Sequence, residues 1–184
     1  MHPERYAAEA RHNLCPLDLF ESTLRQQLLG RVEQADLATN AVRPRTAQPI
    51  CGTPVQDIPG TAQGGGFADP NRAYPEDNTL ALVHDVIHPT PPVFSIGNTV
   101  PGLASGAYAF VPRPSGLVNR DFGAITPDGQ VYGFESLTGR GNSPSPIVLV
   151  KLDRPETLRI EARQAATCGA GPWTLGNAAP TFYR

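Results

Sequence analysis

Hydrophobic and polar residues alternate along most of the chain beyond residue 60. In "TLRIEAR" (157–163), Leu158, Ile160 and Ala162 alternate with charged residues. In "TLALVHDVI" (79–87), Leu80 and Leu82 fall on the same side as His84. Because successive side chains of a strand point to opposite faces, this period of two predicts strands with one buried face.

Short segments of this kind recur at regular spacing, separated by turn residues such as the "TPDGQ" of 126–130. No helical pattern lies between them, so neighbouring strands are expected to pair antiparallel. We expect a mainly β fold, an antiparallel β-barrel, because closure removes exposed strand edges. A β-sandwich is the alternative. The predicted strands are 60–67, 79–87, 93–97, 106–112, 130–135, 147–152, 157–163 and 179–184.

The first fifty residues have a different pattern. Helix formers fill 3–13, and the stretch 15–35 begins with "CPLDLFESTLRQQLL", where apolar residues recur every three or four positions. This spacing predicts an amphipathic helix that begins at Pro16 and whose apolar stripe packs against the β-domain. Gly30 either ends this helix or is tolerated within it. Residues 38–60 are predicted to form an irregular connector. The expected organisation is a helical segment and connector over 1–50, followed by an antiparallel β domain over 51–184. The stripe comprises Leu17, Phe20, Leu24 and Leu28.

Two segments resemble the lipocalin and avidin group of up-and-down barrels. They are the glycine-rich "GTAQGGGF" (60–67), which follows a helical lead-in, and the closing "TFYR" (181–184). That group usually has a Gly-x-Trp in its first strand, and no tryptophan occurs at this place here. The resemblance covers about a dozen residues, so it implies a fold and no binding residue.

Composition narrows the function classes. Net charge is −2, and the fifteen cationic residues, of which only Lys151 is a lysine, form no basic cluster. Nucleic-acid binding is therefore not expected. No apolar run approaches the roughly 20 residues that span a bilayer, so no membrane span is expected. Loops rich in Pro, Gly, Thr, Ser and Asn suggest a secreted or periplasmic protein, although the chain has no signal peptide.

Three cysteines are present, and none has the C-x-x-C spacing of zinc or redox motifs. Cys15 and Cys51 flank the helical segment, so we favour a disulfide between them. A Cys51–Cys168 bridge is the alternative. Either would agree with an oxidising compartment.

"LVHDVIHP" holds the most suggestive polar cluster. On a helix, His84 and His88 would share a face, but the β-branched neighbours and Pro89 favour a strand. Their side chains would then lie about 13 Å apart, too far for one zinc ion. We therefore expect no metal site and no cofactor.

Two further hypotheses concern catalysis and anion binding. A hydrolase could combine His84 and Asp85 with Ser115 and Asp121, since catalytic triads are defined by geometry. Arg120 either pairs with a neighbouring polar group or orients an anionic ligand at the mouth of the barrel.

Aromatic residues suggest where a ligand would sit. Tyr108 and Tyr132 each share a strand face with a phenylalanine two residues on, a pattern typical of a core or of an apolar pocket. Glycines 64–66 and Gly133 would leave space beside them. We expect a bacterial extracytoplasmic binding or interaction protein with a small apolar ligand or a protein partner. A hydrolase and an accessory domain of a larger protein are the alternatives.

Overall fold

The computed structural model describes residues 15–35, 41–52, 55–71, 79–85, 88–139 and 146–184. The helix expected over 3–13 lies outside these residues, as do positions 86–87 of the predicted strand 79–87.

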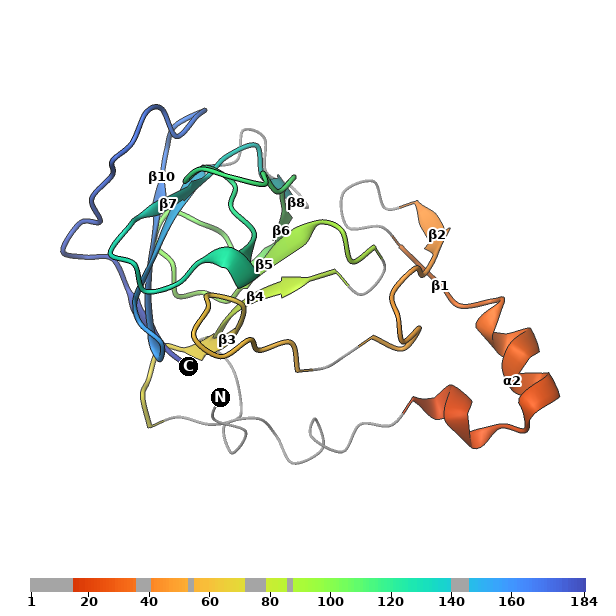
Figure 1. Cartoon of the computed structure of the whole chain (residues 1–184). Helices are drawn as coiled ribbons and strands as arrows, with labels where there is room; N and C mark the ends of the chain where they lie inside the picture. Colours follow the sequence, from red (N-terminus) through yellow and green to blue (C-terminus); the bar gives the residue numbers. More distant parts are fainter. Residues whose placement is uncertain (1–14, 36–40, 53–54, 72–78, 86–87, 140–145) are drawn as a thin grey trace.

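A nine-stranded antiparallel sheet dominates the fold (Figure 1). Its spatial order is β7-β9-β10-β11-β3-β4-β5-β6-β8. The strands are β3 (Gly64–Phe67), β4 (Thr79–His84), β5 (Pro92–Ile96), β6 (Gly106–Ala109), β7 (Tyr132–Phe134), β8 (Thr138–Gly139), β9 (Ile147–Arg154), β10 (Thr157–Arg163) and β11 (Thr181–Tyr183). The prediction of a mainly β, antiparallel fold is confirmed.

The sheet curls into a half-barrel. β3 to β6 pair in chain order, β9 to β11 do the same, and β11 pairs with β3. The two edge strands, β7 and β8, belong to one stretch of chain and are separated only by residues 135–137. Since three residues span at most about 11 Å, the sheet must bend for β7 to reach β9 while β8 reaches β6.

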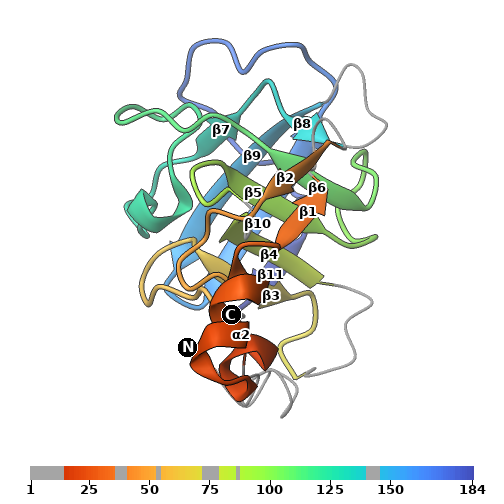
Figure 2. The same cartoon turned by 90° about the vertical axis from the view of Figure 1, so that its right-hand side faces the viewer.

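A small N-terminal arm stands to one side of this sheet (Figures 1 and 2). It contains the 3-10 helix η2 (Pro16–Leu19), the helix α2 (Ser22–Leu29) and a two-stranded sheet of β1 (Glu33–Ala35) and β2 (Val42–Pro44). The helix expected to begin at Pro16 is divided into η2 and α2, so the prediction of one continuous helix is wrong, but its expected end at Gly30 is the C-cap of α2. The prediction of an irregular connector throughout 38–60 is also wrong, because β2 lies within that range.

The helix breaks at Phe20 and Glu21 because Glu21 acts as an N-cap. Its backbone is extended, and its carboxylate accepts hydrogen bonds from the N–H groups of Thr23 (3.0 Å) and Leu24 (2.7 Å). These bonds satisfy N–H groups that the first helical turn leaves unpaired. They also lower the pKa of Glu21.

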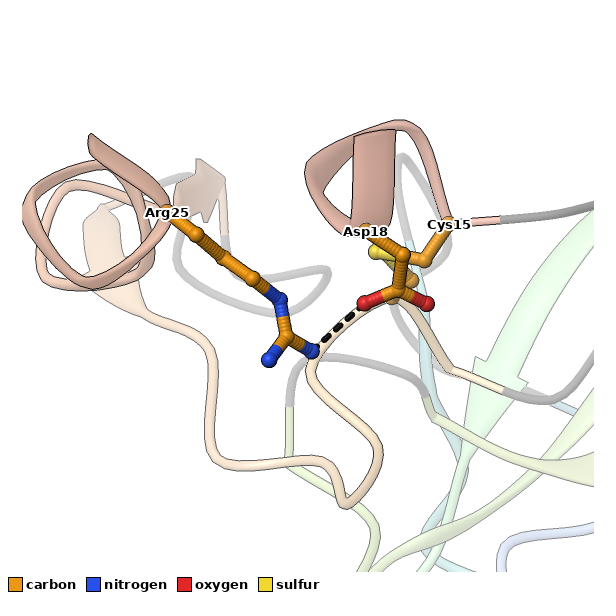
Figure 3. Close-up of a disulfide and its surroundings, with 4 residues drawn as sticks. Cys15, Asp18 and Arg25 are labelled. Carbon is orange, nitrogen blue, oxygen red and sulfur yellow. Dashed lines mark hydrogen bonds and ion pairs between the residues drawn. A yellow bond between two sulfur atoms is a disulfide. The ribbon is translucent and has the colours of Figure 1, made fainter. Parts of the chain in front are cut away.

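No residue of the apolar stripe of the arm is buried. Phe20 and Leu24 remain 45% and 38% exposed, Leu19 is 77% exposed, and neither helix contains a buried residue. A disulfide between Cys15 and Cys51, the pairing favoured above, closes the base of the arm with a Cα–Cα distance of 5.6 Å. Nearby, Arg25 and Asp18 form an ion pair of 2.5 Å (Figure 3).

Phenylalanines fill the concave side of the sheet. Phe94 lies 4.8 Å from Phe122 and 4.9 Å from Phe134, ring centre to ring centre, and both pairs are edge-to-face. Phe110 completes the cluster, and all four rings are buried. Phe122 comes from the 3-10 helix η3 (Phe122–Ala124), so this short helix is anchored against the sheet.

Candidate functional site

The site begins where the connector meets the end of β4. The side-chain amide of Gln56 accepts from the backbone N–H of His84 (2.8 Å) and donates to the His84 carbonyl (3.0 Å). A carboxamide can imitate the peptide group of a neighbouring strand in this way. Gln63 in turn donates to the Gln56 carbonyl (3.1 Å), so two glutamines hold the connector beside the sheet.

The His84 ring is held at both nitrogens. Nδ1 lies 2.5 Å from the Pro89 carbonyl oxygen, and Nε2 lies 3.3 Å from Oδ2 of Asp121. Asp121 is the N-cap of η3, and its Oδ1 accepts from the N–H of Gly123 (3.0 Å). The fold therefore brings together two of the predicted site residues, which are 37 positions apart in the sequence.

A cavity of about 430 Å³ opens beside this pair. It lies between the connector and the end of β4, and Asp85 lines it together with His84. The volume falls in the range of small-molecule sites. Gln56 and Gln63 also line it, and no motif in the sequence marks either glutamine as a site residue.

The other predicted site residues lie elsewhere or have partners of their own. Ser115 is exposed in its loop and is not among the described residues that line the cavity. Arg120 donates to the Pro114 carbonyl. Tyr108 donates to the Ala104 carbonyl (2.8 Å), and Tyr132 donates to Asp128 Oδ2 (2.7 Å).

Both tyrosines are part of the core. Tyr108 and Tyr132 are 2% and 6% exposed and pack in the same apolar cluster as the phenylalanines. Burial, with the hydrogen bond to Asp128 as the next cause, raises the pKa of Tyr132 to about 12. Since their hydroxyls bond within the fold, they stabilise the interior.

The described residues contain no group of three or more His, Cys, Asp or Glu side chains placed to hold a metal ion. Residues 79–84 form a strand, as expected. His88 contacts a different part of the chain, where its Nδ1 lies 3.2 Å from the Thr46 hydroxyl.

Within the described ranges, no helix has the length and apolar character that crossing a bilayer requires.

A second, smaller cavity of about 150 Å³ lies next to the first. Asp57 and Arg184 line it and approach each other to 3.7 Å, with each side chain only 9% exposed. Arg184 also donates to the carbonyls of Thr61 and Gln63. The residue after β11 is thereby joined to the segment that enters β3.

Cys168 is the free thiol, and it is buried. Desolvation first, and the charge of Glu135 second, raise the pKa of Cys168 to about 12. The thiolate is the reactive form of cysteine, so we expect iodoacetamide at pH 8 to leave native Cys168 unmodified. Mass spectrometry should show one alkylated cysteine only after denaturation without reductant, and alkylation of the native protein would contradict this placement.

Comparisons with protein-family models, with curated proteins and with solved structures find no match to this chain.

Proposed function

We propose that this protein is a small extracytoplasmic binding module of a bacterium that takes a small polar ligand in the cavity beside His84. The observation that carries this proposal is the character of the cavity. About 430 Å³ of space is bordered by one imidazole, two carboxylates and three carboxamides, those of His84, Asp57, Asp85, Gln48, Gln56 and Gln63. Groups of this kind orient a ligand through hydrogen bonds.

We propose a polar ligand, although the sequence led us to expect an apolar one, because the described residues fill the interior of the β-domain. The hollow beside glycines 64–66 has no room for a water molecule. A Cβ added to Gly133 would lie 2.8 Å from the sulfur of Cys168 and 3.3 Å from the Trp173 ring. These glycines therefore allow close packing, and the expectation of a cavity beside them is wrong.

A hydrolase is the second candidate, and the contact between His84 and Asp121 is the observation that favours it. A triad histidine uses one nitrogen for the carboxylate and the other for the nucleophile. Here the second nitrogen of His84 faces the Pro89 carbonyl instead. Binding is thus the better supported function. If the protein hydrolyses p-nitrophenyl acetate and the His84→Ala variant does not, the hydrolase becomes the better supported function.

The disulfide supports an oxidising, extracytoplasmic compartment, where such bonds persist. We further propose that the half-barrel is related in architecture to the lipocalin and avidin group. The pairing of β11 with β3, and the hydrogen bonds from Arg184 to the segment before β3, support this kinship.

A thermal-shift screen with free amino acids, monosaccharides and short carboxylic acids tests the proposal. A ligand at a hundredfold excess over its Kd stabilises the native state by about 2.7 kcal/mol. For a chain of this size, Tm should rise by roughly 5 to 10 °C. We expect Val55→Trp, which places a ring in the cavity, to abolish the shift.

Val111→Trp is the matched control, because Val111 is 80% exposed and does not line the cavity. It should retain the full shift. A shift that survives Val55→Trp would place the ligand elsewhere.

A further inference from the structure

The ring of His84 has a hydrogen-bond acceptor beside each of its two nitrogens. Nδ1 lies 2.5 Å from the Pro89 carbonyl oxygen, which can only accept a hydrogen bond. Nε2 lies 3.3 Å from Oδ2 of Asp121, and an ionised carboxylate also only accepts. Because a neutral imidazole carries a single N–H, it can satisfy one of these two contacts and not both.

The two contacts together need two hydrogens. A neutral histidine and an ionised aspartate bring one hydrogen between them, so the arrangement takes up one further proton from the solvent. This count holds whether the proton resides on the ring or on the carboxyl group, because a protonated Asp121 would donate to Nε2 of His84 in its turn. Without that proton, a lone pair of the ring faces an oxygen lone pair at one of the two contacts.

The surrounding fold holds both partners in place. Oδ1 of Asp121 accepts from the Gly123 N–H (3.0 Å), and the buried ring of Phe122 anchors the η3 helix that Asp121 caps. The backbone of His84 is fixed by its two hydrogen bonds to the Gln56 side chain. The separation of the ring and the carboxylate is therefore set by elements that do not titrate themselves.

Other titratable side chains surround the ring. Asp57, from the connector, and Asp85, which follows His84 in the chain, line the same cavity, and Asp57 pairs with Arg184 at 3.7 Å. On β5 the residue paired with His84 is Pro92, which carries no charge. The need for an added proton follows from the two ring contacts alone, so it does not depend on the charge of Asp57 or Asp85.

His88 lies close by in the chain and differs from His84 in its partner. Its Nδ1 lies 3.2 Å from the Thr46 hydroxyl. A hydroxyl can either donate or accept a hydrogen bond, so a neutral His88 satisfies this contact with no added proton. The requirement for a second hydrogen thus distinguishes His84 from the other described histidine.

We propose that His84 and Asp121 form a proton-dependent latch between the end of β4 and the cap of η3. The latch closes when the pair takes up a proton and opens as the pH rises through about 5 to 8, where an imidazole ordinarily loses its charge. Because the folded chain then holds a proton that the unfolded chain releases, the latch stabilises the fold at low pH, and this gain is lost as the pH rises. His84 borders the larger cavity, so opening would change the wall of the binding site. This last consequence alone rests on the proposed function.

Urea denaturation of the full chain at about pH 5.5 and about pH 8 tests the latch. Asp121→Asn removes the charge and keeps an oxygen for the Gly123 N–H, since asparagine is an equally good N-cap. The His84 and Asp121 side chains are 24% and 35% exposed, so water weakens their attraction. We expect the variant to raise the equilibrium constant of unfolding about two- to fivefold at the lower pH, the effect of one partly exposed ion pair. At the higher pH we expect no increase, and an equal increase at both would overturn the latch.

Two controls separate the latch from a general effect of pH. In a chain that already carries His84→Gln, Asp121→Asn should have the same effect at both pH values, because no ring is left to take up the proton. His88→Gln is the matched control, since its contact with Thr46 needs no added proton. Its effect on the unfolding constant should not change with pH, and a change as large as that of Asp121→Asn would overturn the assignment to His84.

Nitrogen NMR of the imidazole rings tests the same point on the unaltered chain. At about pH 5.5 both ring nitrogens of His84 should carry hydrogen, and at about pH 8 only Nδ1, which faces Pro89, should do so. The signals are assigned by their loss in His84→Gln. A latch that fails these tests leaves the proposed binding function standing, because the thermal-shift screen measures ligand uptake directly. Conversely, a screen in which no ligand raises Tm would overturn the proposed function and leave the latch.

Discussion

Replacing Phe94 with alanine should destabilise the protein by about 3 to 5 kcal/mol, the usual cost of removing a buried phenylalanine. Phe94 is fully buried and contacts three other rings, two of them edge-to-face. Removing the ring leaves a cavity, and the paired strands β4, β5 and β6 cannot move together to close it. Urea denaturation followed by circular dichroism measures the change, and the midpoint should fall with little change in slope.

Phe20→Ala is the matched control. It removes the same side chain from the arm, where the ring is 45% exposed. We expect the free energy of unfolding to change by less than about 0.5 kcal/mol. Equal losses at the two positions would mean that the arm packs against the sheet in solution.

The β-domain could be predicted because its signal is local and repeated. In β10, Leu158 and Ile160 are buried and their neighbours are not, and the strand has the bounds that its alternation predicted. Alternation reports which face is covered, and burial alternates in β4, β10 and β11, whereas the first four residues of β9 are buried on both faces and form a continuous apolar run. β8 escaped prediction because two residues, Thr138 and Gly139, are too few to show a period.

The arm shows where pattern alone fails. Apolar residues every three or four positions predict a helix with a covered face, but they do not say that a partner exists. Here the acidic Glu21 caps a new helix in the middle of the predicted one, and Phe20 remains exposed. An N-cap changes the free energy of a helix by less than about 2 kcal/mol. The spacing of apolar residues does not report so small a difference, so it cannot show whether the helix continues or is capped anew.

The candidate site was predictable only in part, for a related reason. His84 and Asp121 are chemically conspicuous residues, so they could be named, but nothing in the sequence sets the 3.3 Å between them. That distance depends on where β4 ends and on the cap of η3. Ser115 is equally conspicuous and does not line the cavity, whereas Gln56 and Gln63 are inconspicuous and do. Chemistry-bearing residue types suggest a site, and the tertiary fold selects its members.

Replacing Gly64 with alanine should destabilise the protein by about 3 to 5 kcal/mol, the range for breaking a buried ion pair. Gly64 has a φ of +133°, and an added Cβ would overlap Arg184 Nη2 and the Asp57 carboxylate, with its Cγ only 2.7 Å away. Both charged side chains are nearly buried, so they cannot separate without losing their hydrogen bonds inside the fold. The same displacement would deform both cavities, because Asp57 lines each of them.

Gly60→Ala isolates the steric part of this effect. Gly60 also has a positive φ, +76°, yet nothing lies within 4 Å of the added Cβ. It should therefore cost only the backbone penalty of about 1 to 2 kcal/mol. Urea denaturation of the two variants measures the difference, which is assigned to the crowding around Asp57 and Arg184. If the two variants lose the same free energy of unfolding, Arg184 does not join β11 to the segment before β3 in solution. The contact between β11 and β3 would then depend on backbone pairing alone.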